Sequence, residues 1–397
     1  MIKEKYLASE KFNPRIFLSN NSRLKERINS VKKINYNLFL HKEHVFNNKK
    51  IFTIILTVYQ SDFNFIKSSI NSVFSQTYNN TEIIIIDNGT QGEIKKFLES
   101  SFEKNPNSKL IQTNRNEFDP FKDDLNDPII NLLNAGLFTS IGDYVYFLSY
   151  DDMLSTNYVE KMVQLFESNP NCYTTSPLIQ SIDANGNINK SITEIFLKRN
   201  NRNKYTNGIE LAESYMNEED KILFPGGLLA IKSELVLNLG GFDNMSDLSQ
   251  LFKFGVNGDS GFDNDAILFW RHHSLQTNLL QKKLGLVYYQ NCISFLENYS
   301  IFNLHNNIAG TQFANKFLKW YKQFTFEFST NSVRDSLKYG LKPFFKALLK
   351  LKNENAPYFY FFFIIVNLPF DIANLIFQNI LYTKVRYFKR LLFNSSN

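Results

Sequence analysis

The sequence is poor in cysteine, and this excludes two kinds of site. Only Cys172 and Cys292 occur among its 397 residues, and there is no CxxC pair. A disulfide framework and a cysteine-based structural zinc site are therefore excluded. Two isolated cysteines are typical of a protein that stays in a reducing compartment.

The glycine-rich loops of common nucleotide-binding folds are also missing. The sequence has no GxGxxG after its first predicted strand and no GxxxxGK[ST] anywhere. These absences disfavour dinucleotide-dependent oxidoreductases and P-loop NTPases. A nucleotidyltransferase is disfavoured as well, because it needs a glycine-rich basic loop after the first strand, and TVYQSDFNF at that place has neither glycine nor a basic residue.

Long apolar runs and a strong net charge are lacking too. The run YFYFFFIIV at residues 358–366 is too short to cross a bilayer, and the first fifteen residues contain no apolar core of a signal peptide. We therefore expect a cytoplasmic protein, or one that lies peripherally on the inner face of the cytoplasmic membrane. The net charge of +6 suits an anionic ligand or membrane surface, and no nucleic-acid partner is expected.

Short apolar runs alternate with amphipathic segments over the first half of the chain. The apolar runs lie at residues 51–58, 82–86, 109–113, 142–149 and 172–177, and segments with helical spacing separate them. This alternation predicts an α/β fold whose mostly parallel sheet is covered by helices on both faces.

Polar residues follow the predicted strands where these end. Thr57 and Tyr59 close the first strand, Asp87 the second, and Asp151 and Asp152 follow FLS. The carboxyl ends of parallel strands meet at one edge of a sheet, where ligands bind. Adjacent carboxylates raise each other's pKa, so the pair indicates either a solvated turn or a site shared with a cation and an anionic ligand.

Composition predicts three regions along the chain. Residues 1–48 form a basic extension with a helix near 22–33, residues 49–295 form the α/β domain, and residues 296–397 form a helical region. Residues 185–221 are polar and weakly patterned, and we expect them to form a long loop over the site.

The last hundred residues combine aromatic and basic side chains. Basic helices with aromatic faces are predicted at 312–324 and 333–351, and the apolar run at 358–366 precedes a basic tail. This composition favours a segment that lies in a membrane interface. Packing on the α/β domain or a dimer contact is the alternative.

Four segments in a fixed order resemble glycosyltransferase family 2. They are TIILTVY, INSVFSQTYNNTEIIIIDNGT, NAGLFTSIGDYVYFLSYDD and LGGFD, and the likeness runs from about residue 51 to 289. Members of this family are inverting enzymes of GT-A fold that use nucleotide-diphosphate sugars. The resemblance implies the same fold here, with a UDP-sugar as the expected donor.

The resemblance also implies roles for the residues at the strand ends. Asp87 would contact the nucleotide base, with Thr57 and Tyr59 lining the same pocket. Asp151 would lie near the ribose. Asp152 would hold a divalent metal, Mn or Mg, on the diphosphate.

A later acidic motif of the family is matched only in part. Asn264-Asp265 followed by Arg271 has the expected spacing, which makes Asp265 the implied catalytic base, although Asp263 stays open as the base instead. Arg271, His272 and Gly227 are the candidate contacts to phosphate or acceptor. Arg271 bracing the loop is the alternative role for that residue, and His273 is a second acceptor candidate.

The implied function is inverting transfer of a sugar to a glycan or lipid-linked acceptor. Surface polysaccharide biosynthesis, such as that of LPS, O-antigen, capsule or exopolysaccharide, is the expected setting. Two positions depart from the family pattern, because Leu133 and Asn264 replace an arginine and a glutamate. These departures favour the alternative, a catalytically silent GT-A module that binds sugar nucleotide or serves as a scaffold.

Overall fold

The computed structural model groups the chain into two compact units. The first comprises Met1–His273 with Ser294–Phe317, and the second Ser274–Ile293 with Leu318–Asn397. The domain boundaries predicted at residues 48/49 and 295/296 stay predictions. The residues that the structure describes are 22–34, 36–42, 45–113, 127–199, 203–217, 229–243, 248, 250–274, 276, 283, 285, 289–298, 301–373 and 375.

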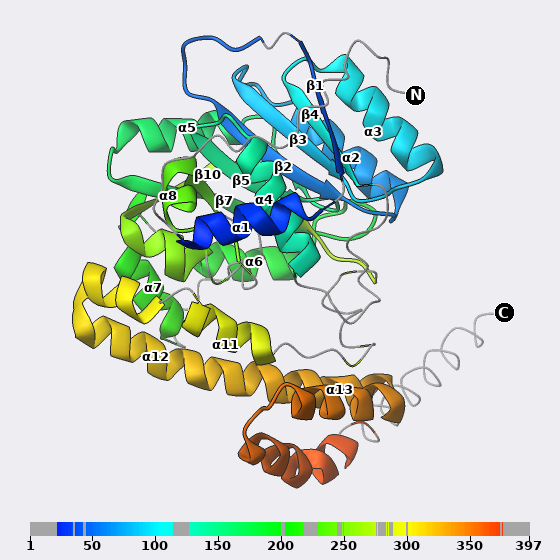
Figure 1. Cartoon of the computed structure of the whole chain (residues 1–397), viewed down its shortest axis with the longest axis vertical. Helices are drawn as coiled ribbons and strands as arrows, with labels where there is room; N and C mark the ends of the chain where they lie inside the picture. Colours follow the sequence, from blue (N-terminus) through cyan, green and yellow to red (C-terminus); the bar gives the residue numbers. More distant parts are fainter. Residues whose placement is uncertain are drawn as a thin grey trace, which may run out of the picture. The chain divides into compact units, whose positions relative to one another are not determined.

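A mixed sheet forms the centre of the first unit (Figure 1). Its order is β1-β4-β3-β2-β5-β9-β7-β10-β6, with β8 paired to β10. The central strands β4, β3, β2 and β5 are parallel, as are β7 and β10, whereas β1, β6, β8 and β9 run antiparallel to their neighbours. The strands are β1 (Tyr36–Leu40), β2 (Phe52–Val58), β3 (Thr81–Asp87), β4 (Ser108–Thr113), β5 (Tyr144–Ser149), β6 (Met153–Leu154), β7 (Cys172–Ile182), β8 (Tyr205–Asn207), β9 (Ala230–Lys232) and β10 (Asp259–Arg271).

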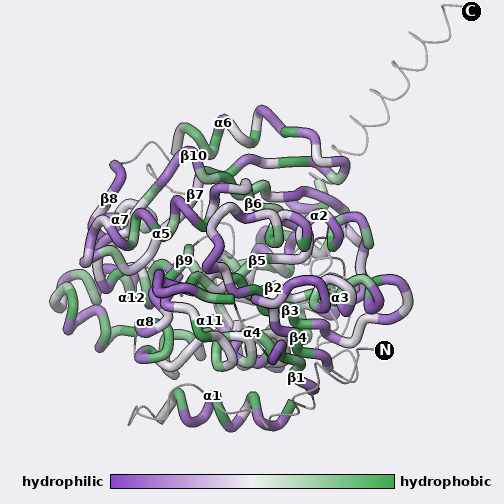
Figure 2. Tube along the Cα trace, turned by 90° about the horizontal axis from the view of Figure 1, so that it is seen from above, coloured by the Kyte–Doolittle hydropathy of each residue, from purple (hydrophilic) through white to green (hydrophobic). Residues whose placement is uncertain are grey.

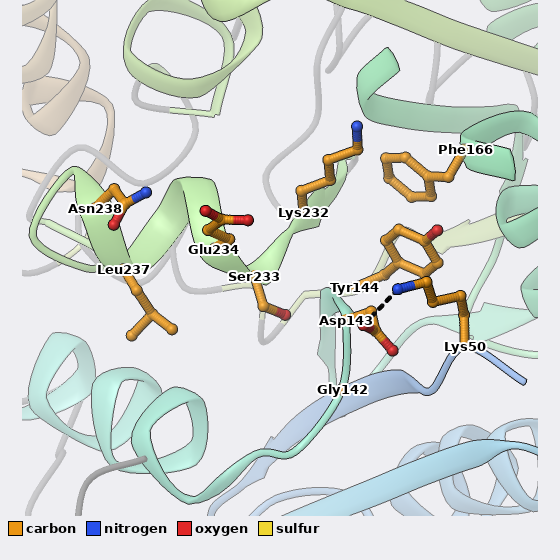
Figure 3. A pocket seen from close by; sticks show the side chains of 10 residues that line it. All are labelled: Lys50, Gly142, Asp143, Tyr144, Phe166, Lys232, Ser233, Glu234, Leu237 and Asn238. Carbon is orange, nitrogen blue, oxygen red and sulfur yellow. Dashed lines mark hydrogen bonds and ion pairs between the residues drawn. The ribbon is translucent and has the colours of Figure 1, made fainter. Parts of the chain in front are cut away.

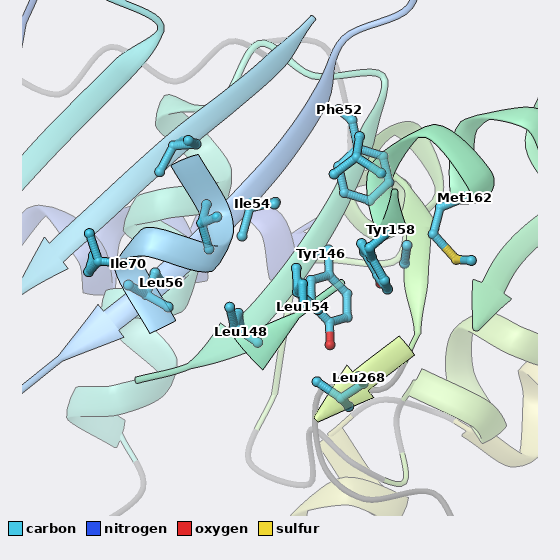
Figure 4. Close-up of a cluster of buried hydrophobic side chains, with 14 of the residues drawn as sticks. Phe52, Ile54, Leu56, Ile70, Tyr146, Leu148, Leu154, Tyr158, Met162 and Leu268 are labelled. Atoms are coloured by element: carbon cyan, nitrogen blue, oxygen red, sulfur yellow. The ribbon is translucent and has the colours of Figure 1, made fainter. Parts of the chain in front are cut away.

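The central strands are buried on both faces, as their continuous apolar runs require. All of β3 is buried, and β2 is buried except at Thr57, which is half-buried. Along β2, Phe52, Ile54 and Leu56 belong to one core cluster (Figure 4), whereas Ile55 packs beneath a helix on the opposite face.

Helices cover the two faces in the way that the alternation predicts. Side chains of α2 (Phe63–Phe74), α3 (Gly92–Lys104) and α5 (Tyr158–Ser168) fill the core cluster on one face. On the other face α4 (Asp127–Thr139) packs on β2 and β3, and α1 (Ser22–Lys32) contacts α4. The predicted GT-A-type α/β class is thereby confirmed.

The predicted N-terminal helix is confirmed as α1. Figure 2 shows hydrophobic and hydrophilic residues alternating along it. Leu24 and Val31 on its apolar side are buried.

Hydrogen bonds connect helix α4 to a segment that lies far away in the sequence. The side chain of Asn134 accepts a hydrogen bond from Phe242 N over 2.9 Å and donates one to Phe242 O over 3.1 Å. Gly241, at φ 84°, brings that backbone close, and a Cβ there would lie 2.4 Å from Asn134 Oδ1. Two residues later, Gly136 lets α4 approach the sheet, because a Cβ there would lie 2.7 Å from Ile55 Cγ2.

The predicted long loop at residues 185–221 is wrong over most of its described part. It contains α6 (Lys190–Arg199), β8 and α7 (Gly208–Met216). Phe196 of α6 is buried and packs against Trp270 at a ring distance of 5.6 Å. Asn207 caps α7 by accepting a hydrogen bond from Ile209 N over 2.9 Å. Helix α6 exposes most of its residues from 190 to 197, so its apolar pattern is faint. After β9 the chain forms α8 (Ser233–Asn238).

The second unit is helical, as predicted for the C-terminal region. Its elements include parts of α11 (Tyr289–Asn298) and α12 (Ile301–Ser336), with η5 (Leu337–Tyr339) and α13 (Leu341–Asn353). The single helix predicted at 333–351 is wrong, because the chain is interrupted at Gly340, whose φ is 116°. No helix within the described residues is both long enough and apolar enough to cross a membrane. The core consists of Val333, Leu337, Phe344, Ala347, Leu351, Ala356, Tyr360 and Ile364.

Gly136→Ala tests the close approach of α4 to the sheet. Helix propensity alone would stabilise the variant by about 1 kcal/mol. We expect a loss of about 1–3 kcal/mol in the free energy of unfolding instead, because the added Cβ overpacks against Ile55. Urea denaturation measures this. The loss should shrink in an Ile55→Ala background, and a stabilised Gly136→Ala protein would contradict the packing described.

Candidate functional site

The strand ends that carry the predicted site residues lie side by side. In the register of the sheet, Thr57 pairs with Ser149, and Val58 pairs with Asp87. The loop after β5 begins directly after Ser149 and contains the two adjacent aspartates. The structure therefore brings Thr57, Asp87 and the aspartate pair to one edge of the sheet, as the sequence predicts.

Asp87 is a buried carboxylate fixed by its neighbours. Its Oδ1 accepts a hydrogen bond from Thr90 N over 2.8 Å, and its Oδ2 accepts one from Gln112 Nε2 over 2.9 Å. Burial raises the pKa of Asp87, and the bonds from Thr90 and Gln112 oppose that rise. A carboxylate held in this way is oriented before any ligand arrives. Its contact with a nucleotide base stays a prediction.

Tyr59 is joined to Tyr150, a site residue that the sequence analysis missed. Their hydroxyls lie 2.9 Å apart and their rings pack edge to face, with centroids 4.7 Å apart. Burial and the charge of Asp151 raise the pKa of Tyr150, so its hydroxyl stays protonated. An aromatic residue directly before two aspartates was the available signal.

Asp151 and Asp152 are both buried, and each has its own partner. Asp151 Oδ2 accepts a hydrogen bond from His273 Nε2 over 2.8 Å, and Asp152 Oδ1 accepts one from Arg271 N over 2.9 Å. The pKa of Asp152 lies well above its ordinary value of 3.8, because burial and the charge of Asp151 disfavour ionisation while Arg271 opposes them. The pair is therefore not a solvated turn.

Arg271 braces the loop that carries the pair. Its Nε donates to Asp151 O over 2.8 Å, and its Nη1 donates to Asp183 O and Ala184 O over 3.3 and 3.2 Å. The guanidinium carbon lies 4.9 Å from the centre of the Phe65 ring. Burial lowers the pKa of Arg271, although the nearby carboxylates oppose this. These contacts support the bracing role, and a contact with phosphate stays a prediction.

The two histidines after β10 lie on opposite sides of the extended chain. His273 shares the side of Arg271 and reaches Asp151. His272 shares the side of Trp270, with ring centroids 4.0 Å apart, and burial lowers its pKa. His272 Nε2 is buried and forms no hydrogen bond with the described residues. His273 is therefore the histidine that belongs to the carboxylate cluster.

The structure does not bring Asp265 to the other predicted residues. It lies in an irregularity of β10 between Asp263 and Ile267, its side chain is 68% exposed, and its Oδ2 pairs with Lys161 Nζ over 3.2 Å. Roughly 13 Å of regular strand separates Ile267 from Arg271. The prediction of a base at Asp265 has no support from this geometry.

Asp263, the alternative base, does not add to the cluster. Asp263 turns its carboxylate to the local backbone and accepts hydrogen bonds from Asp265 N and Ala266 N over 2.8 and 3.2 Å. Gly227 lies outside the described residues.

The residues at the site fit a divalent cation that a ligand helps to hold. Asp152 Oδ2 accepts no hydrogen bond from any residue that the structure describes, which leaves one buried carboxylate oxygen available. Nowhere in the described chain do three His, Cys, Asp or Glu side chains gather as a metal cage. Mg²⁺ is commonly bound through one or two carboxylates together with phosphate oxygens and water, and this site offers that arrangement.

A separate hollow lies at the opposite edge of the sheet. It measures about 610 Å³ and is lined by residues such as Lys50, Asp143, Tyr144 and Lys232 (Figure 3). Tyr144 is the first residue of β5, whereas the aspartate pair follows its last. This hollow is therefore distinct from the carboxylate cluster.

Comparison with known families identifies the part of the chain that holds this cluster. Residues 53–216 match the family described as glycosyl transferase family 2. The matched segment contains Thr57, Asp87, Asp151 and Asp152, so the resemblance stated from the sequence is confirmed over these residues. Arg271 and Asp265 lie beyond it.

Similar proteins are glycosyltransferases without an assigned substrate. Two uncharacterized glycosyltransferases of Haemophilus influenzae are 30% and 28% identical over 122 residues, which is 31% of this chain and 34% and 44% of theirs. The chain thus spans less than half the length of these curated relatives. Among solved structures, residues 1–349 of S. aureus TarS in complex with UDP-GlcNAc cover 73% of this chain and 81% of their own, at 13% identity and a TM-score of 0.47. That likeness is too weak to support a conclusion about function.

The raised pKa of Asp152 predicts that its ionised carboxylate destabilises the metal-free protein at neutral and alkaline pH. A carboxyl with a raised folded pKa stabilises the fold while protonated and loses this contribution as pH rises from its ordinary value of 3.8 through the folded value. Asp152→Asn cannot ionise and keeps an oxygen for Arg271 N. We expect its melting temperature without metal to exceed that of the wild type at pH 8, with the difference vanishing near pH 4. Exposed Asp265→Asn is the control, and an unstabilised Asp152→Asn would contradict the burial of this charge.

The variant Arg271→Lys distinguishes two roles for Arg271, which are bracing of the aspartate loop and contact with phosphate. A lysine cannot reproduce the forked contacts to three carbonyl oxygens. We expect a loss of about 1–3 kcal/mol in the free energy of unfolding with no nucleotide present. Chemical denaturation measures this, with exposed Lys161→Met as the control. A residue that served only to bind phosphate would leave the unliganded stability unchanged.

Proposed function

We propose that this protein transfers a sugar from a nucleotide-diphosphate sugar, with a UDP-sugar as donor, to an acceptor hydroxyl with inversion at the anomeric carbon. One observation carries the proposal. The segment that matches glycosyltransferase family 2 carries a buried pair, Asp151 and Asp152, at the same sheet edge as Asp87. Arg271 donates a hydrogen bond to each member of this pair.

The reaction requires that the leaving diphosphate be stabilised. A bound Mn²⁺ or Mg²⁺ supplies positive charge to the phosphate oxygens. Asp152 would hold the cation through Oδ2, since Oδ1 is engaged by Arg271 N. Asp151, oriented by His273, would accept hydrogen bonds from ribose hydroxyls. Asp87 would accept a hydrogen bond from the N–H of a base, with Tyr59 following the neighbouring strand β2.

The incoming hydroxyl must also lose its proton, and a positioned carboxylate contributes roughly 10²–10⁴-fold to such a step. Direct displacement from the face opposite the leaving group gives inversion. Asp265 was the predicted base, but its exposed ion pair with Lys161 gives it no reach to the carboxylate cluster. The base is therefore the part of the proposal that most needs an experiment.

The acceptor and the cellular setting are further parts of the proposal. A glycan or lipid-linked acceptor, a role in surface polysaccharide biosynthesis, and a peripheral position on the inner face of the cytoplasmic membrane are supported by the family and by the aromatic, basic C-terminal region. TarS, whose structure is reported with UDP-GlcNAc, makes that nucleotide sugar a useful member of any donor panel.

A silent module that binds sugar nucleotide without turnover is the second candidate. The observation that favours it is the replacement of the family's arginine and glutamate by Leu133 and Asn264. Leu133 is buried in the packing of α4, and Asn264 is exposed, so neither supplies a charge at the site. Turnover distinguishes the two candidates.

Release of nucleoside diphosphate from a panel of nucleotide sugars tests the proposal directly. We expect one donor to be consumed in the presence of Mn²⁺ and the rate to fall at least about 100-fold in Asp152→Asn, because the charge on the leaving group is no longer offset. Exposed Glu93→Gln, in the first turn of α3, serves as the matched control for the loss of one carboxylate. Metal-dependent binding without turnover of any donor, even with glycan acceptors added, would support the silent module.

Asp265→Asn and Lys161→Met together test the base. If Asp265 only forms a surface ion pair, both variants should keep kcat within about fivefold of the wild type. A fall of at least about 100-fold in Asp265→Asn alone would establish it as the base and contradict the geometry described here.

A further inference from the structure

The second unit exposes a helix face made of apolar side chains. The helix at residues 358–373 turns Tyr360 and Ile364 into the core of this unit. Its outward positions carry no charged residue. Tyr358 is 90% exposed, Phe362 71% and Phe370 67%. We call this surface the aromatic face; its residues are Tyr358, Phe359, Phe362, Ile365, Val366, Phe370 and Ile372.

Helix α13 of the same unit also has a buried inner side and an exposed apolar row, and lysines lie beside this row. Phe344, Ala347 and Leu351 are buried, one or two turns apart along its inner side. An exposed row of Leu341, Phe345 and Leu349 follows the outer side at intervals of four residues. Lys342 and Lys346 lie one position further round the helix and are exposed as well. This pattern of an apolar row beside lysines is typical of helices that lie in the plane of a membrane interface.

The carboxylates around these helices are already engaged. Asp371 forms two 2.7 Å hydrogen bonds with Arg334, and Asp335 pairs with Lys338. Glu354 is half-buried and accepts a hydrogen bond from Gln290 N. The charged side chains that α13 itself exposes are lysines, namely Lys342, Lys346 and Lys352.

An apolar surface of this kind is rare on a protein that stays in water. Three occupants deserve comparison: a second copy of the chain, residues 376–397 of the same chain, and a lipid surface. A symmetric dimer would bring the lysine rows of two copies to one interface, where like charges repel. Residues 376–397 add Lys384, Arg386, Lys389 and Arg390, which are again positive. Anionic lipid headgroups complement both the lysines and the aromatic side chains.

We propose that the aromatic face and the outer row of α13 dock on a bilayer surface that contains anionic lipid, with both helices lying in the interface. This assigns a definite surface to the peripheral membrane position named under the proposed function. It does not depend on which donor or acceptor is used, because turnover in solution is measured without lipid.

Vesicle sedimentation with the full chain tests the proposal. The vesicles are phosphatidylcholine alone or a 7:3 mixture of phosphatidylcholine and phosphatidylglycerol. The test variant combines Tyr358→Ser, Phe362→Ser and Phe370→Ser. The matched control combines Ile188→Ser, Ile195→Ser and Leu197→Ser, which are exposed apolar residues of the first unit. We expect the test variant to lose at least about tenfold in partitioning to the mixed vesicles, and the control to match the wild type.

The lysines test the charge component separately. Lys342→Gln and Lys346→Gln should each lower partitioning to the mixed vesicles by about fivefold and leave the weak binding to phosphatidylcholine unchanged. High salt should have the same effect. An unchanged melting temperature of every variant shows that the loss is not due to unfolding.

Three outcomes would overturn the proposal. The first is equal vesicle binding by the wild type and the test variant. The second is a wild type that binds no vesicles but forms a dimer that the test variant dissociates, which would assign the aromatic face to a second copy. The third is a wild type that binds only after deletion of residues 376–397, which would show that the chain's own end covers the face. Metal-dependent turnover by the test variant in solution would leave the proposed function standing in every case.

Discussion

Arg271 is the constraint on which the candidate site depends. Its backbone N–H and its guanidinium bind both members of an aspartate pair whose charges would otherwise repel, and the same guanidinium holds the carbonyls of residues 183 and 184. With this brace in place Asp152 is buried and its pKa is raised, and its Oδ2 accepts no hydrogen bond from any residue that the structure describes. Ionisation of two adjacent buried carboxyls at this loop is therefore unfavourable, and a bound cation with its anionic ligand would stabilise their charged forms.

The scaffold places this loop by a small number of close contacts. Parallel pairing of β2 with β3 and β5 sets Asp87 and the aspartate pair on one edge. On the far face of the sheet, Gly136 lets α4 approach Ile55, and Asn134 ties that helix to the backbone of Phe242. Segments that look like separate motifs in the sequence are therefore parts of one packed arrangement.

Much of this could be predicted from the sequence because the central strands are buried on both faces and read as unbroken apolar runs. The ends of these strands could therefore be predicted as well, and with them the positions of Asp87, Asp151 and Asp152. Other parts could not be predicted, for physical reasons. β10 is irregular between Asp263 and Ile267, so spacing along the sequence does not tell where the carboxylate of Asp265 lies, and its role as the base stays a prediction.

The choice between His272 and His273 could not be made from the sequence either. Successive residues of an extended chain point to opposite sides, and only the pairing of β10 with β6 and β7 decides which side faces the aspartates. Helix α6 was missed because only Thr193 and Phe196 are buried over residues 190–197, which leaves a weak apolar pattern. Helix α7 was missed because it is short and only two of its buried residues, Leu211 and Met216, have large apolar side chains.

The dependence of Mn²⁺ binding on nucleotide tests the central claim most directly. Electron paramagnetic resonance would measure the affinity of the protein for Mn²⁺ with and without UDP. The account predicts weak binding of Mn²⁺ alone, because the described residues offer no cage of three ligands, and much tighter binding with UDP present, lost in Asp152→Asn. Equal affinity with and without UDP, or an Asp152→Asn protein that still binds both, would contradict it.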